Sequence, residues 1–248
     1  MSLDGTKIGW IGAGKMGGPM SRRLVGAGAT LAVYDPVAAN VEAVVATGAR
    51  AASSNQDVIA DADIVISMIP NDAVLGAITI GEEGIFANLA PGTIYVDMST
   101  VSPEASGEVS AAAVAAGIDY LRAPVSGSVA LAEAGKLTIM VSGPKDAADK
   151  CADVFAAMSA ENFYLGVDDQ ARYLKLVINL LVGTSSAVLA EALTLGRKGG
   201  LDWEQMIDVI GVSAAASPYI QYNVVPLKAR DFSAQFTSEQ MVKDSRLI

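Results

Sequence analysis

The stretch that decides the fold is residues 7–35, KIGWIGAGKMGGPMSRRLVGAGATLAVYD. It predicts a short apolar strand, a Gly-x-Gly-x-x-Gly turn at residues 12–17, a helix to about Gly28, and a second strand that ends in Asp35. This order of elements is the fingerprint of a dinucleotide site in a Rossmann-type fold. The glycines let the backbone turn tightly and approach a pyrophosphate, whose charge the helix N-terminus meets.

Asp35 indicates which dinucleotide is preferred. A carboxylate at this strand end can accept hydrogen bonds from both ribose hydroxyls but repels a 2′-phosphate, and no arginine follows it directly. The sequence therefore favours NAD over NADP. The cofactor-binding residues predicted in this unit are Gly12, Gly14, Lys15, Met16, Gly17 and Asp35.

The alternation of strands and helices continues to about residue 165. Apolar strands are expected at residues 60–69, 93–97, 118–121, 137–141 and 163–165, with helices at 102–116 and 145–158. We interpret residues 1–165 as an α/β domain with a doubly wound parallel sheet. Ligands of such sheets bind beyond the carboxyl ends of strands, where residues 68–70, 97–100 and 124–127 fall.

A second domain, residues 166–248, is predicted to be all helical. It opens with a long helix over about residues 168–199, DDQARYLKLVINLLVGTSSAVLAEALTLGRKG. Further helices are expected at 203–212, 218–225 and 238–246, with Pro218 and Pro226 as breaks. The domain looks short at its C-terminus.

The long helix carries Lys175 and Asn179 one turn apart in an apolar context. A membrane span would have to accommodate Arg172, Lys175, Asn179 and three hydroxyl residues, so we expect no membrane partner. Two interpretations remain from the residues alone: a buried core helix whose lysine reaches the surface, or a functional lysine.

Composition excludes several classes of function. The formal net charge of −10 disfavours nucleic acid as a partner, and 52% hydrophobic with 18% charged residues is typical of a globular protein. The chain has no histidine and one cysteine, so histidine-dependent catalysis and multi-cysteine metal sites are excluded, and we expect no metal. No signal peptide pattern opens the sequence, so a cytoplasmic location is expected.

Several ordered motifs together resemble the β-hydroxyacid dehydrogenase family, which includes 3-hydroxyisobutyrate dehydrogenases and tartronate semialdehyde reductases. The motifs are the glycine turn, DMST at 97–100, APVSG at 123–127, the Lys175 and Asn179 pair, and Phe236 followed by Lys243-Asp244. The resemblance implies a Rossmann domain followed by an all-α domain, and relatives are usually dimers or tetramers. A homodimer or homotetramer is therefore expected.

The resemblance also implies roles for individual residues. Lys175 matches the catalytic lysine and Asn179 its partner, whereas the loop of Ser126 and Gly127 would hold the substrate carboxylate. Ser99 and Ser128 are further substrate-binding candidates. The remaining cofactor-binding candidates are Met68, Ile69, Pro70, Thr100 and Lys243.

These residues predict an oxidoreductase that transfers a hydride between NAD(P) and a small 3-hydroxy acid or its semialdehyde, with Lys175 as general acid and base. A lysine serves in this way only if its pKa is brought toward neutrality, which burial and a neighbouring cation would do. Two alternatives stay open. One is a reductase of another small aldehyde or keto acid, such as succinic semialdehyde or glyoxylate, and the other is a dinucleotide-binding module without catalysis.

The sequence departs from the family pattern at two positions beside the APVSG motif. Arg122 stands where an acid is common, and Ser128 where a second glycine is common. Arg122 could alter substrate selection, or it could pair with a nearby carboxylate outside the pocket. Relatives also usually continue well beyond the Lys-Asp pair, whereas this sequence stops at Ile248.

Overall fold

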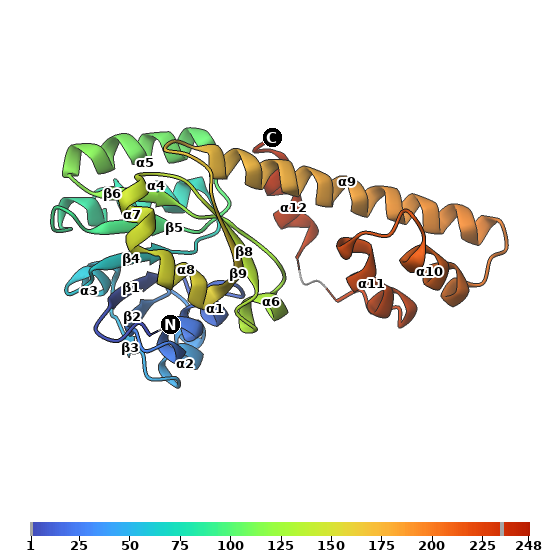
Figure 1. Ribbon diagram of the computed structural model, residues 1–248, viewed down its shortest axis with the longest axis horizontal. Helices are drawn as coiled ribbons and strands as arrows, with labels where there is room; N and C mark the ends of the chain where they lie inside the picture. The colour runs from blue at the N-terminus through green and yellow to red at the C-terminus, as the bar shows by residue number, and fades with distance from the viewer. Residues whose placement is uncertain (1, 234–235) are drawn as a thin grey trace. The chain divides into compact units, whose positions relative to one another are not determined.

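The computed structural model describes residues 2–233 and 236–248 (Figure 1). Two compact units are present, Met1–Lys175 and Leu176–Ile248. The long helix α9, Gln170–Lys198, belongs to both units, because the boundary falls inside it.

The first unit is built on a parallel sheet of six strands. Their order is β3-β2-β1-β4-β5-β6, and all neighbouring strands are parallel. The strands are β1 (Lys7–Ile11), β2 (Thr30–Tyr34), β3 (Arg50–Ala51), β4 (Ile64–Ser67), β5 (Ile94–Asp97) and β6 (Asp119–Arg122). This is the Rossmann strand order, so the predicted α/β fold with a doubly wound parallel sheet is confirmed.

Helices cover both faces of this sheet and bury a separate apolar core on each (Figure 1). Alternate residues of a strand point to opposite faces, so Ile94 and Val96 join one core while Tyr95 joins the other. The helices of the first unit are α1 (Gly17–Gly26), α2 (Ala38–Val45), α3 (Asn55–Ile59), α4 (Asp72–Thr79), α5 (Pro103–Ala116), α6 (Val129–Glu133), α7 (Lys145–Lys150) and α8 (Ala152–Met158), with a 3-10 turn at Ile85–Ala87.

The prediction that residues 137–141 and 163–165 complete the main sheet is wrong. They form a second sheet of three strands, β7 (Val125–Ser126), β8 (Leu137–Val141) and β9 (Ser159–Tyr164). β7 and β8 are antiparallel, whereas β8 and β9 are parallel. The chain between β7 and β8 is too short for the dozen or more residues of a parallel crossover, so it reverses direction instead.

One predicted helix is interrupted and one predicted strand is shorter than expected. The helix over residues 145–158 divides at Cys151, whose backbone leaves the helical conformation (φ −88°, ψ 2°). The strand expected at 60–69 is limited to β4, because α3 runs to Ile59 and is followed by a turn. The start of α5 is as predicted, since the Ser102 side chain caps it by accepting a hydrogen bond from the Ala105 amide.

The second unit contains the rest of α9 and three helices, α10 (Trp203–Val212), α11 (Pro218–Lys228) and α12 (Ser238–Ser245). A small core of Leu193, Met206 and Ile207 joins α9 to α10. The prediction that Pro226 breaks a helix is wrong, because α11 continues to Lys228. Pro226 lies in the last turn, where the absent N–H removes one bond without stopping the helix.

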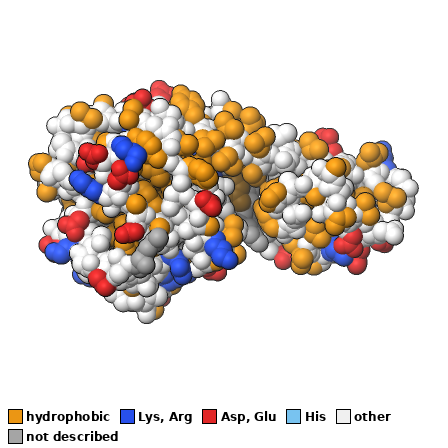
Figure 2. Space-filling view, in the orientation of Figure 1, with side chains coloured by type: hydrophobic (Ala, Val, Ile, Leu, Met, Phe, Trp, Pro, Cys, Tyr) orange, Lys and Arg blue, Asp and Glu red, His pale blue; other side chains and the backbone are white. Residues whose placement is uncertain are grey.

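Among the described residues, α9 is the single helix that is long and apolar enough to cross a membrane, by length and composition alone. Several large apolar side chains on it are exposed, and Figure 2 shows hydrophobic side chains gathered over this helix. They include Val177, Leu181, Val188 and Leu195. The predicted span of about residues 168–199 is confirmed within two residues at its start and one at its end.

Candidate active site

The glycine turn between β1 and α1 forms a cradle from which side chains are sterically excluded. Gly12 has a φ of +92°, and a Cβ there would lie 2.3 Å from the carbonyl oxygen of Met68. A Cβ on Gly17 would lie 2.0 Å from the carbonyl oxygen of Gly12. Gly14 differs, because a Cβ there would meet nothing within 4 Å. Gly12 and Gly17 are therefore required by the fold, while the space beside Gly14 is open.

The N-terminus of α1 suits an anion. The residue before the helix, Met16, makes no side-chain cap, and the first turn holds no acidic residue. Gly18 already donates its N–H to the Gly14 carbonyl oxygen at 2.9 Å, and Pro19 has no N–H. What this helix start offers an anion is therefore the positive end of the helix dipole, with no acidic side chain in the first turn to oppose it. Together with the open space at Gly14, this arrangement fits a bound dinucleotide.

Asp35 follows β2 and is held firmly in place. Its Oδ2 accepts a hydrogen bond from the Ala13 amide at 2.8 Å, and its Oδ1 accepts from the Val37 amide at 2.8 Å and from Asn40 Nδ2 at 3.0 Å. The carboxylate is thereby attached to the glycine turn itself. This is the position from which the predicted contact with a ribose would be made.

Two loops follow the neighbouring strands β4 and β5, and the first of them lies beside the glycine turn. Ser67 at the end of β4 pairs in register with Asp97 at the end of β5, so residues 68–70 and 98–100 leave the sheet together. The Ile69 amide donates a hydrogen bond to Ser99 Oγ at 2.8 Å, which joins the two loops. The loop of Met68, Ile69 and Pro70 is thus joined to that of Thr100, and Met68 and Ile69 lie beside Gly12.

Ser99 lies deeper than a substrate contact would suggest. Its side chain is fully buried, and its hydroxyl donates to Asp97 Oδ1 at 2.6 Å while accepting from Ile69. The structure therefore gives this serine a role in holding the loops, and its predicted contact with substrate stays a prediction.

A buried ion pair under these loops was not anticipated from the sequence. Arg172, in the first turn of α9, donates through Nη2 to Asp97 Oδ2 at 2.5 Å, and the two side chains are 1% and 0% exposed. Nη2 also donates to the Tyr120 hydroxyl at 2.9 Å. Burial, with the charge of Asp97, raises the pKa of the neighbouring Tyr95 phenol well above its usual value. The site is therefore built on a desolvated polar network.

Arg122 forms a second, partly buried ion pair. Its Nε donates to Asp169 Oδ1 at 3.0 Å, and its guanidinium lies 4.5 Å from the centroid of the Tyr120 ring. Pairing with a nearby carboxylate was one of the two roles considered for this arginine, and the pair is present. A role in substrate selection stays a hypothesis.

The predicted carboxylate-binding loop lies between β7 and α6. Gly127 has a φ of +142°, a backbone conformation that other residues rarely adopt, so this position favours glycine. Ser128 occupies the place of the family's second glycine and caps α6, accepting a hydrogen bond from the Leu131 amide at 3.4 Å. Ser126 is half-buried at the end of β7. The anion contacts of this loop stay a prediction.

Lys175 lies half-buried on α9 in the first unit, and Asn179 follows one turn later in the second. Asn179 is 8% exposed, and its Nδ2 donates to Asp244 Oδ2 on α12 at 2.7 Å. Lys243 Nζ lies 2.7 Å from Asp244 Oδ1. Asp244 was not among the predicted site residues, although its place beside Lys243 in the sequence was a signal. It orients the asparagine amide.

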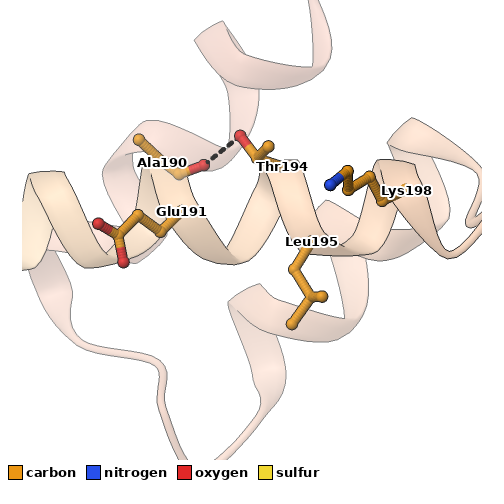
Figure 3. A pocket seen from close by; sticks show the side chains of 5 residues that line it. All are labelled: Ala190, Glu191, Thr194, Leu195 and Lys198. Carbon is orange, nitrogen blue, oxygen red and sulfur yellow. Dashed lines mark hydrogen bonds between the residues drawn. The ribbon is translucent and has the colours of Figure 1, made fainter.

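In the part of the chain that the structure describes, neither a metal cluster nor the hollow on α9 includes a predicted site residue. No group of three or more His, Cys, Asp or Glu side chains that could hold a metal ion occurs in residues 2–233 and 236–248. A shallow hollow of about 400 Å³ lies along α9 and is lined by five residues of that helix alone, with Thr194 donating a hydrogen bond to the Ala190 carbonyl (Figure 3). None of the predicted site residues lines it.

Known proteins with the same organisation identify the family. Residues 7–166 match the family described as the NAD binding domain of 6-phosphogluconate dehydrogenase, and residues 170–248 match the NAD-binding family of NADP-dependent 3-hydroxyisobutyrate dehydrogenase. The chain belongs to the β-hydroxyacid dehydrogenase family, as its motifs predicted. It is an NAD(P)-dependent 3-hydroxyacid dehydrogenase, transferring a hydride between the dinucleotide and a small hydroxy acid.

Three relatives show how far the similarity extends. The chain is 39% identical to 2-(hydroxymethyl)glutarate dehydrogenase of Eubacterium barkeri, over 96% of this chain and 79% of that protein. It is 36% identical to the NAD-dependent L-serine dehydrogenase of Pseudomonas aeruginosa, over 96% of this chain and 82% of that protein. The structure of Mycobacterium tuberculosis 3-hydroxyisobutyrate dehydrogenase with L-serine matches at a TM-score of 0.87 and 31% identity, over 100% of this chain and 85% of that one.

Proposed function

We propose that the protein oxidises a 2-substituted 3-hydroxypropanoate to its semialdehyde, with NAD as the preferred dinucleotide and Lys175 as the group that handles the proton. The observation that carries the proposal is the half-buried Lys175 on α9, followed one turn later by an asparagine whose amide is fixed by Asp244. A general acid or base must be held at a defined place, and this helix provides one.

The substrate class follows from what the relatives are named for. 2-(Hydroxymethyl)glutarate, L-serine and 3-hydroxyisobutyrate all carry a primary alcohol on the carbon next to the one that bears the carboxylate. They differ only in the substituent at carbon 2. The loop of Ser126 and Gly127 would bind the shared carboxylate through backbone donors and a hydroxyl.

The residues of this chain have separate tasks in the reaction. Bound NAD(P) supplies the hydride acceptor or donor. During oxidation, a neutral Lys175 amine takes the hydroxyl proton as the carbinol C–H bond breaks and the carbonyl forms. During reduction, the Lys175 ammonium returns that proton to the developing alkoxide. Asn179, held by Asp244, donates to the same oxygen and keeps it in line for transfer.

Asp35 supports the preference for NAD. Its carboxylate is anchored at three hydrogen bonds beside the glycine turn, so it cannot swing away from an incoming 2′-phosphate without breaking them. The Asp35 carboxylate would therefore repel the 2′-phosphate of NADP and weaken its binding. Parallel kinetics with NADH and NADPH test this directly.

The deciding experiment compares Lys175→Ala with a control, Lys145→Ala, on a panel of hydroxy acids and aldehydes. Lys145 is an exposed lysine in the same unit, paired with Asp149 on the surface. We expect Lys175→Ala to reduce kcat by about 100-fold or more and Lys145→Ala to leave it unchanged. Full turnover in Lys175→Ala would refute the assignment. A panel in which succinic semialdehyde or glyoxylate is the best substrate would favour the alternative reductase.

We also propose that the exposed stripe on α9 binds a second copy of this chain. Leu181, Val188 and Leu195 recur at seven-residue intervals, which is the spacing of a helix–helix contact, and they are 63%, 60% and 73% exposed. A Leu181→Glu/Val188→Glu variant should shift the protein toward monomer in light scattering after gel filtration. A native protein that already elutes as a monomer would refute this proposal.

A further inference from the structure

The Arg172–Asp97 ion pair is costly to bury, so its presence calls for an explanation beyond stability. Removing two charges from water carries a desolvation cost that their attraction often only balances, and apolar replacements of such pairs are frequently as stable. Neither side chain reaches substrate in the chemistry proposed above. What the pair provides is a fixed geometry.

The pair attaches both strand-end loops to one helix. Asp97 Oδ1 accepts from Ser67 Oγ at 2.7 Å and from Ser99 Oγ at 2.6 Å, and the same Ser99 hydroxyl accepts from the Ile69 amide. Arg172 Nη1 donates to the Ser99 carbonyl oxygen at 2.6 Å. One guanidinium and one carboxylate therefore determine where the loops carrying Ile69 and Thr100 lie relative to α9.

The first turn of α9 is held at two points. Asp169, immediately before the helix, is bound by Arg122 at the end of β6, and Arg172 is bound by Asp97 at the end of β5. Two attachments three residues apart fix both the rotation of a helix about its axis and its translation along it. Lys175 follows Arg172 by three residues, so it lies on nearly the same side of the helix, about 4.5 Å further along.

We propose that Arg172 and Asp97 are positioning residues that set the location of Lys175 relative to the loops of Ile69 and Thr100. This inference rests on the proposed proton-handling role of Lys175. The ion pair of Arg122 and Asp169 is the second attachment of the first turn of α9. An arginine is required at position 172 because its planar fork reaches the Ser99 carbonyl, the Asp97 carboxylate and the Tyr120 hydroxyl together, which a lysine ammonium cannot do.

The test uses Arg172→Met and Arg172→Lys in the full chain, with Arg50→Met as the matched control. Arg50 forms a surface ion pair with Asp57 in the same unit, far more exposed at 52% and 32%. The measurements are kcat per NADH-binding site, the KM for the hydroxy acid, the NADH affinity by fluorescence, and the primary deuterium isotope effect on kcat. Counting binding sites removes any contribution from unfolded protein.

A misplaced Lys175 predicts a specific pattern of results. For Arg172→Met, kcat should fall by about 100-fold with a larger isotope effect, while the KM for the hydroxy acid and the NADH affinity change by less than about threefold. Arg172→Lys should restore part of kcat, and Arg50→Met should match the wild type. A purely structural role would lower the melting temperature but leave kcat per site and the isotope effect unchanged, and that result would overturn the inference.

Two further variants keep the outcome decisive. If Arg172→Met does not fold because Asp97 is left as an unpaired buried charge, Arg172→Met/Asp97→Asn removes that charge and retains the shape, and the same loss of kcat is expected. Full kcat in the double variant would overturn the inference. Lys175→Ala separates the two proposals: if it is inactive while Arg172→Met is fully active, only the positioning role fails, whereas an active Lys175→Ala refutes both.

Discussion

Gly14→Ala and Gly17→Ala should separate the two reasons for which glycines occur in the turn after β1. A Cβ on Gly17 would lie 2.0 Å from the Gly12 carbonyl oxygen, which also accepts the Trp10 indole hydrogen bond at 2.8 Å. A Cβ on Gly14 would meet nothing within 4 Å, and Gly14 is not among the glycines with positive φ. We therefore expect alanine to be opposed by the protein itself at position 17 and only by a bound dinucleotide at position 14.

The expected changes in the free energy of unfolding follow from these contacts. At Gly17, overpacking costs about 1–3 kcal/mol, and disturbing the buried Trp10 bond adds about 1–3 kcal/mol. The sum, about 2–6 kcal/mol, lowers the melting temperature of a unit of this size by roughly 5–20 °C. At Gly14, alanine costs nothing in the fold and restricts the unfolded chain, so the free energy of unfolding should rise by at most about 1 kcal/mol.

The assay is scanning calorimetry without ligand, combined with calorimetric titration of NADH. We expect Gly14→Ala to melt with the wild type and to bind NADH at least tenfold more weakly, since a methyl group would occupy the path of the pyrophosphate. We expect Gly17→Ala to have a melting temperature below that of the wild type. Unchanged NADH binding by Gly14→Ala, or a melting temperature as low as that of Gly17→Ala, would refute the reasoning.

Three further predictions concern charge and titration. Asp35→Asn should raise the ratio of kcat/KM for NADPH over NADH by about tenfold, because it removes the repelling charge, and an unchanged ratio would show that Asp35 does not select the dinucleotide. Burial raises the pKa of the Cys151 thiol to about 12, so at pH 8 the native protein should react with a thiol reagent only after unfolding, and rapid labelling of the native protein would contradict this. The pKa values of Tyr95 and Tyr120 are raised, mainly by burial, so above about pH 10 the unfolded chain releases phenol protons that the folded chain keeps. The free energy of unfolding should therefore fall as pH rises through this range in urea titrations, and a constant value between pH 9 and 11 would count against the buried network.

Much of the first unit could be predicted because its signals are local. Gly17 is required by a backbone contact within the turn and Gly12 by one with Met68 just after β4, and strands such as IYVD at β5 are short apolar runs between turns. The same holds for α9, whose length and terminal charges define it. Local patterns of this kind can be recognised in a single sequence.

Pairings between distant residues could not be predicted in the same way. Arg172 and Asp97 are 75 positions apart, and Arg122 and Asp169 are 47 apart, so no spacing rule links them. A buried strand also reads the same whether its partner is parallel or antiparallel, and β8 was therefore assigned to the wrong sheet. In the helical unit, Pro226 predicts a stop because proline opposes helix, but the last turn of α11 tolerates it.

The position of the unit boundary within α9 has a consequence for protein engineering. Lys175 is the last residue of one unit and Leu176 the first of the next, while Asn179 and its partner Asp244 lie wholly in the second. A chimera joined to a relative at this point would exchange the asparagine together with the carboxylate that orients it, and would leave the lysine with its own anchoring arginine. Such a chimera would divide neither hydrogen-bonded set.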